Sequence, residues 1–181
     1  STSEAQQAVS TILARQMIEF MNTGAVAGCV NLPPLSAEAA KEVGPWMPLM
    51  TELGKLANRL VPAASKLHIT YAGRTEALDT RPLSRLLVAA MLGSASGRVT
   101  PVNALTEAGA RGLLVSETLG GDGDGFDRLL KIEVGNEKST RSIEATLHRG
   151  PRVVRLDGVE LDFDPGAHVL LMKNEDRPGV I

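Results

Sequence analysis

Three arginines near the middle of the chain form the clearest candidate binding site. Arg74 and Arg81 flank the start of a helix that Pro82 is predicted to open. Arg85 follows one turn further along the same helix. Free backbone amides at a helix N-terminus attract anions, and guanidinium groups pair well with phosphate and carboxylate. These residues predict a phosphate or carboxylate site; the alternative is a solvated basic turn, because exposed arginines beside helices are common.

The histidines do not suggest catalysis. A nucleophilic triad needs a Ser or Cys beside a His, and the only histidines are His68, His148 and His168. All three lie in predicted strands, which favours ordinary strand side chains over a general base or a metal ligand. The sequence also lacks GxGxxG, Walker A and zinc-ligand spacings. We therefore expect neither a catalytic residue nor a metal site in this chain.

The acidic clusters also predict structure rather than chemistry. Four carboxylates bracket a predicted hairpin, and we expect them to lie in solvent at a sheet edge, where they discourage pairing with strands of other molecules: Asp157, Glu160, Asp162 and Asp164. The run "LGGDGDG" at 119–125 lacks the glutamate that completes an EF-hand calcium loop. A flexible glycine loop is the expectation there.

Composition excludes several kinds of partner. Only 3% of the 181 residues are aromatic and the net charge is −2, so stacking on nucleic-acid bases and binding to anionic membranes are not expected. No run approaches the roughly 20 apolar residues of a membrane span. The single cysteine, Cys29, excludes an intramolecular disulfide, and its apolar neighbours predict a buried side chain. A reducing compartment follows, either cytoplasmic or the stroma of an organelle.

Periodicity predicts helices first and strands later. Helical spacing and capping residues indicate helices at 3–24, after Ser36, and at 46–60, 82–93 and 103–112, with Asn103 as a cap. Alternation and turn residues indicate strands at 67–73, 111–118, 128–134, 141–148, 152–156, 159–163 and 168–173. Asp157-Gly158 is a strong two-residue hairpin signal.

This order predicts an α+β fold. We expect an α/β sandwich in which a mainly antiparallel sheet carries helices on one face and N-terminal helices precede it. The "DPG" at 164–166 is the best candidate for a domain boundary. The ending "NEDRPGVI" reads as a turn and a helix entry without the helix, so we expect a piece of a longer chain.

Several separated stretches resemble one enzyme family, the long-form D-3-phosphoglycerate dehydrogenases. They occur in the family's order: "STSEAQ", "GAVAGCVNLP", "PWMPLMTELGKLANRL", "VNALTEAGARGLLVSE" and "NEDRPGVI". The first resembles the element after the family's catalytic histidine, and the last resembles the first strand and turn of its ACT domain. The resemblance spans the chain from end to end.

The resemblance implies a parent enzyme that oxidises 3-phosphoglycerate with NAD in serine biosynthesis. Residues 1–34 would be the exit helix and linker from the catalytic core, 35–165 the intervening regulatory domain, also called the allosteric substrate-binding domain, and 166–181 the start of the ACT domain. The chain itself would hold no cofactor, because NAD would bind in the missing core. Homo-oligomerisation and regulation, rather than turnover, would be its role.

The resemblance also implies an effector. In the family's ACT domains serine is held near the end of the first strand, at positions that correspond to Asn174 and Asp176. Serine, phosphate or 3-phosphoglycerate are the expected small-molecule partners, with no nucleic acid and no membrane. Two alternatives stay open: a serine dehydratase-like domain, which the absence of cluster-ligating cysteines disfavours, and a purely structural spacer.

Overall fold

A computed structural model describes residues 2–23, 35–75, 78–93, 98–166 and 168–172. Its helices are α1 (Ser3–Thr23), α2 (Ala37–Val43), α3 (Trp46–Leu60), α4 (Arg81–Gly93) and α5 (Ala104–Ala110). Its strands are β1 (Lys66–Gly73), β2 (Leu114–Leu119), β3 (Arg128–Gly135), β4 (Thr140–Leu147), β5 (Pro151–Leu156) and β6 (Val159–Phe163). Cys29 and the connector around it lie outside the described residues.

The strands form a single six-stranded sheet in the order β2-β1-β3-β4-β5-β6. β2 runs parallel to β1, and the other neighbouring strands pair antiparallel. The register places Ile69 beside Ile132, and Ile132 beside Ile143, so three buried side chains line up across the sheet. The α+β prediction is therefore confirmed, with one parallel pair where the chain crosses over through α4 and α5.

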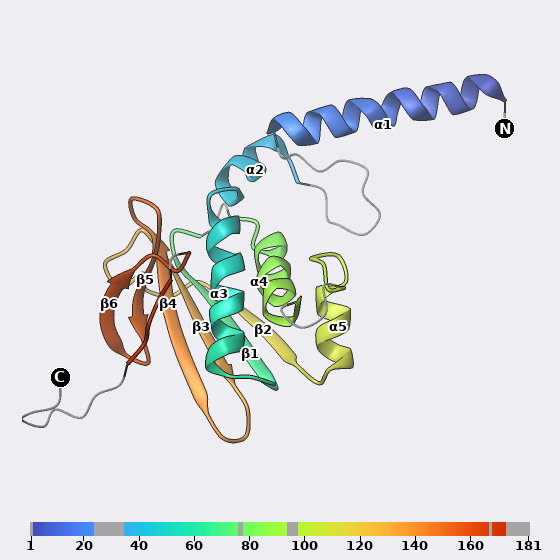
Figure 1. Cartoon of the computed structure of the whole chain (residues 1–181). Helices are drawn as coiled ribbons and strands as arrows, with labels where there is room; N and C mark the ends of the chain where they lie inside the picture. The colour runs from blue at the N-terminus through green and yellow to red at the C-terminus, as the bar shows by residue number, and fades with distance from the viewer. Residues whose placement is uncertain (1, 24–34, 76–77, 94–97, 167, 173–181) are drawn as a thin grey trace, which may run out of the picture.

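Helices α3 and α4 cover one face of this sheet (Figure 1). Their apolar residues recur at helical spacing, and Leu49, Leu53, Leu83 and Leu87 are all fully buried. They pack with the strand side chains into one aliphatic core. Because the chain has few aromatic residues, the core consists mainly of closely packed Leu, Ile, Val, Ala and Met side chains.

The N-terminal helix α1 projects away from this body (Figure 1). Its apolar side chains are exposed, from 52% for Leu13 to 83% for Met21. In contrast, α2 is short and is joined to α3 by a tight turn at Gly44 and Pro45. This corner places the start of α3 near the ends of β3 and β4. No described helix is long and apolar enough to cross a membrane.

Of the helix caps and the last strand predicted from local sequence, only one cap is confirmed. Ser36 caps α2 as predicted, because its hydroxyl accepts a hydrogen bond from the amide of Ala39 at 3.1 Å. Asn103 stands at the start of α5, but its side chain accepts from the Thr100 amide at 2.7 Å and makes no capping bond. The strand predicted at 168–173 was wrong for 168–172, which pair with no described strand and so have no ladder to stabilise them.

Candidate functional site

Arg81 is already bound to a carboxylate of the same chain. Its Nε and Nη2 donate to Asp79 Oδ1 and Oδ2 at 2.9 and 2.7 Å, and its backbone amide donates to Oδ1 at 3.2 Å. These hydrogen bonds from Arg81 hold the pKa of Asp79 below its ordinary value. Asp79 therefore supplies the anion at the N-terminus of α4.

The other two predicted arginines have separate partners. The side chain of Arg74 is 83% exposed and reaches Asp127 Oδ1 only at 3.5 Å. Arg85 Nη1 lies 3.4 Å from the carbonyl oxygen of Val102. Among the described residues no contact joins the three arginines to one another, so an anion site built from them stays a prediction. The predicted effector residues Asn174 and Asp176 lie outside the described part of the chain.

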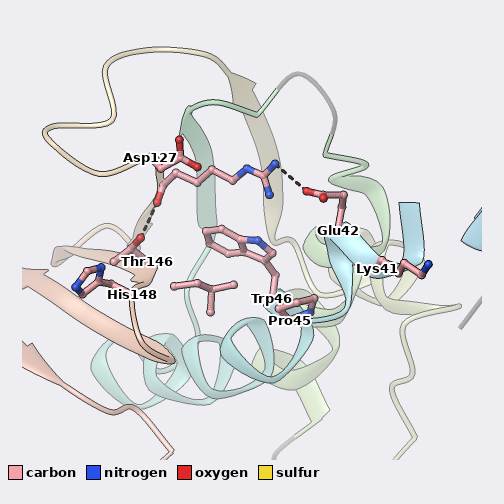
Figure 2. Close-up of a pocket in the computed structure, with 9 residues that line it drawn as sticks. Lys41, Glu42, Pro45, Trp46, Asp127, Thr146 and His148 are labelled. Carbon is pink, nitrogen blue, oxygen red and sulfur yellow. Dashed lines mark hydrogen bonds and ion pairs between the residues drawn. The ribbon is translucent and has the colours of Figure 1, made fainter. Parts of the chain in front are cut away.

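A cleft of about 280 Å³ opens where the α2–α3 corner meets the ends of β3 and β4 (Figure 2). The residues that line it come from α2, α3, β3, β4 and the turns beside them: Lys41, Glu42, Pro45, Trp46, Asp127, Arg128, Thr146, Leu147 and His148. It combines apolar walls with charges of both signs. Figure 2 shows Trp46 in the middle of this group, with Asp127 and Thr146 on one side and Glu42 on the other.

Arg128, the first residue of β3, is held rigidly in the wall of the cleft. Its Nε donates to the carbonyl oxygen of Arg74 at 2.7 Å, and its Nη2 lies 2.8 Å from Glu42 Oε2. The Thr146 hydroxyl donates to the Arg128 carbonyl oxygen at 2.7 Å. Only Nη1 of this guanidinium has no partner among the described residues. Both N–H groups of Nη1 are thus unused, on a side chain that is only 24% exposed.

Trp46, the first residue of α3, offers a further unused donor. The residue is 4% exposed, and its indole N–H has no hydrogen-bond partner among the described residues. None of the fully buried side-chain polar atoms in the described part of the chain lacks a partner. The indole nitrogen must therefore retain some contact with solvent, and the cleft that Trp46 lines provides it. α3 also lacks a side-chain cap, and the amide of Met47 donates instead to the carbonyl oxygen of Gly44 at 3.2 Å.

Asp127 and His148 complete the mouth of the cleft. The carboxylate of Asp127 is 67% exposed and has only the long contact to Arg74. The prediction of a strand through His148 was wrong, because β4 ends at Leu147 and the chain turns through positive φ at Arg149 and Gly150. His148 is exposed, and its imidazole makes no hydrogen bond or ion pair within the described part of the chain. In that same part of the chain no group of His, Cys, Asp and Glu is arranged to hold a metal ion.

Comparison with known proteins identifies the fold family. Residues 42–157 match the model for the D-3-phosphoglycerate dehydrogenase intervening domain. The chain belongs to this family. That confirms the resemblance expected from the sequence motifs.

Relatives of the whole chain agree with the intervening-domain match. A D-3-phosphoglycerate dehydrogenase of Bacillus subtilis is 27% identical over 185 residues, and one of Archaeoglobus fulgidus is 27% identical over 184. D-3-phosphoglycerate dehydrogenase 3, chloroplastic, of Arabidopsis thaliana is 27% identical over 201 residues. All of this chain is covered in each case, but only 35%, 35% and 34% of the relative. The chain thus spans about a third of the curated relatives it matches.

Apart from Lys41, every residue that lines the cleft lies inside the matched intervening domain. Sequence reasoning missed this site because its parts are more than 80 positions apart, as Trp46 and Arg128 are. Trp46 is buried as its helical spacing predicted, yet its ring nitrogen has no hydrogen-bond partner among the described residues. The only usable signal was the single tryptophan directly after Pro45 at a helix start.

The structure also pairs the acidic hairpin with arginines, which the sequence did not show. Asp157 lies 2.6 Å from Arg141, and Asp162 lies 2.6 Å from Arg152. The pKa of Asp162 is lowered by its hydrogen bond from Arg152. These carboxylates are therefore ion-paired rather than a bare solvated edge.

Proposed function

We propose that the chain is the regulatory and assembly part of an NAD-dependent D-3-phosphoglycerate dehydrogenase of serine biosynthesis. The observation that carries the proposal is the match of residues 42–157 to the intervening domain of that enzyme. The relatives extend over about three times the length of this chain, which leaves room for an NAD-binding catalytic core elsewhere. On this proposal the chain alone does not turn over substrate, and the enzyme acts in the cytoplasm or an organelle stroma.

Regulation would operate through a small anionic or amino-acid effector: serine, phosphate or 3-phosphoglycerate. An effector that binds one arrangement of domains more tightly shifts the population toward that arrangement, and the shift is limited by the difference in affinity. Arg74, Arg85 and the cleft at Trp46 provide unsaturated donors for such a ligand. Arg81 contributes only if the ligand displaces Asp79.

Assembly into a homo-oligomer is supported by the exposed apolar side chains of α1. Monomeric proteins seldom leave such groups uncovered in one place. The exposed members are Val9, Ile12, Leu13, Met17, Ile18 and Met21.

A thermal-shift titration of the chain with 3-phosphoglycerate, phosphate and serine tests the proposal. A ligand bound only by the folded state raises stability by RT ln(1 + [L]/Kd), about 2.7 kcal/mol at a hundredfold excess over Kd. We expect a shift that Arg74→Ala or Arg85→Ala weakens and that Lys138→Gln, an exposed cation in the β3–β4 turn, leaves unchanged.

Two results would contradict the proposal. No shift with any of these compounds would favour a structural spacer. Deamination of serine by the chain alone would favour the dehydratase alternative. In a protein that also contains the catalytic core, the regulatory role further requires the effector to change the rate of NADH formation from 3-phosphoglycerate.

A further inference from the structure

We propose that the cleft at the α2–α3 corner binds a free α-amino acid in its zwitterionic form. The ligand's carboxylate would accept hydrogen bonds from Trp46 and Arg128, and its ammonium group would face Asp127. The inference names a site and a ligand class for the effector, and its regulatory consequence rests on the proposed function. Binding itself is independent of that function.

The donors for a carboxylate are already in place. The indole N–H of Trp46 and the Nη1 group of Arg128 have no partners among the described residues, and both residues line the cleft. Arg128 is fixed by its contacts to the Arg74 carbonyl oxygen and to Glu42, so little side-chain entropy is lost when a ligand binds. A planar guanidinium is also well suited to a carboxylate.

The charge balance of the lining favours a zwitterion over a phosphate. The lining contains two cations, Lys41 and Arg128, and two carboxylates, Glu42 and Asp127. Glu42 is occupied by Arg128, and Figure 2 shows the amine of Lys41 directed away from Trp46. The group left without a close partner is the carboxylate of Asp127. It would repel a dianion and attract an ammonium group.

The size of the cleft also limits the ligand. Pockets for drug-sized molecules start at roughly 300 Å³, and this cleft has about 280 Å³. Pro45, Leu147 and the indole ring supply apolar walls that can pack against a short side chain. A small amino acid fits these dimensions.

The chain provides its own probe for this site, because Trp46 is its only tryptophan. We would titrate the intrinsic fluorescence with L-serine, L-alanine and glycine, and separately with acetate, methylamine and phosphate at matched ionic strength. We expect a saturable change with at least one amino acid. Acetate or methylamine, which carry one half of the zwitterion each, should give no saturation in the same concentration range.

Two variants test the assigned contacts. Asp127→Asn removes the charge that meets the ammonium group. Because this change weakens a hydrogen bond between charged groups, the variant should bind the amino acid about tenfold to hundredfold more weakly. Trp46→Phe keeps an aromatic ring but removes the donor; followed by calorimetry, it should bind about tenfold more weakly. Glu137→Gln, an exposed carboxylate that does not line the cleft, is the matched control and should bind like the parent chain.

The inference is overturned if no amino acid gives a saturable signal, if phosphate saturates the cleft instead, or if Asp127→Asn binds as tightly as Glu137→Gln. Folding of each variant is checked by circular dichroism, and Trp46→Phe gives a second, independent test if Asp127→Asn fails to fold. An arginine-dependent phosphate shift without cleft binding would leave the proposed function intact. If an amino acid binds in the cleft but does not change the dehydrogenase rate, the proposed regulation is wrong and the binding site is still supported.

Discussion

Arg81 and Asp79 form a two-point contact at the start of α4, with Nε–Oδ1 at 2.9 Å and Nη2–Oδ2 at 2.7 Å. Oδ1 also accepts the backbone amide of Arg81. One carboxylate therefore satisfies both the helix end and the guanidinium that the sequence suggested for a ligand. An external anion at Arg81 has to compete with an intramolecular partner.

Asp79→Asn should weaken this start of α4. An Asn side chain retains an acceptor for the backbone amide but cannot form the charged two-point contact with Arg81. Loss of a helix-capping interaction typically costs about 1 kcal/mol, so we expect a destabilisation of that order or less in urea unfolding. The freed Arg81 should also bind phosphate more readily. Unchanged stability relative to Glu137→Gln would show that the contact contributes nothing measurable.

Asp79 also gives a prediction for pH. Its pKa lies below the ordinary value of 3.8 because Arg81 donates to it in the folded state. The stabilisation is therefore fully present only well above the ordinary pKa, and it is lost as the pH falls through the lower, folded-state pKa. Asp124 and Asp162, whose pKa values are lowered by Arg155 and Arg152, act in the same direction. The urea midpoint of the parent chain should fall more steeply below pH 4 than that of Asp79→Asn.

The strands that alternation predicted are largely present, because burial of one sheet face imposes a period of two on the sequence itself. β1 is the clearest case, with Leu67, Ile69 and Tyr71 buried. The hairpin between β5 and β6 was equally readable: Asp157 and Gly158 have φ of 51° and 79°, as a turn with two left-handed residues requires.

Contacts between residues far apart in the sequence could not be predicted from local patterns. Arg155 contacts Asp124, 31 positions away, and the cleft joins Trp46 to Arg128. Charge clusters in a sequence do not say which opposite charges fold onto them. The sequence therefore predicts solvated carboxylates near 160, whereas the structure pairs Asp157, Glu160 and Asp162 with arginines. The apolar run at 168–172 was predicted as a strand from its residue types alone. It forms no strand because no described strand lies beside it to pair with.

Tyr71 and Ser84 share a hydrogen bond inside the core, with the two hydroxyl oxygens 2.7 Å apart. Burial raises the pKa of Tyr71 well above its ordinary value. Tyr71→Phe or Ser84→Ala alone leaves one buried hydroxyl unpaired, which costs about 1–3 kcal/mol. The double variant removes both groups and should be less destabilised than the sum of the single changes. Strict additivity in urea unfolding would show that the two hydroxyls are not coupled.

Arg155 ties the glycine loop at 119–125 to the sheet. Its guanidinium lies 2.8 Å from Asp124 and 3.3 Å from Glu160, and it also contacts Glu144. Arg155→Gln should release Asp124 and speed amide hydrogen exchange at residues 120–126. Arg141→Gln, which breaks the ion pair with Asp157, is the control and should leave exchange in the loop unchanged. Equal exchange in both variants would mean that the loop is held by its own backbone.

Two helical glycines should respond oppositely to alanine. At Gly54, where α3 meets α4, an added Cβ would lie 2.4 Å from the Leu87 carbonyl oxygen and 2.8 Å from Ala90 Cβ, so the helices must separate. At Gly109 in α5 an added Cβ would meet nothing within 4 Å. Alanine gains up to about 1 kcal/mol of helix propensity at either position, but overpacking typically costs about 1–3 kcal/mol. Gly54→Ala should therefore be destabilised and Gly109→Ala neutral or more stable. Calorimetric melting of both variants checks this, and a stable Gly54→Ala would show that the α3–α4 contact can widen at little cost.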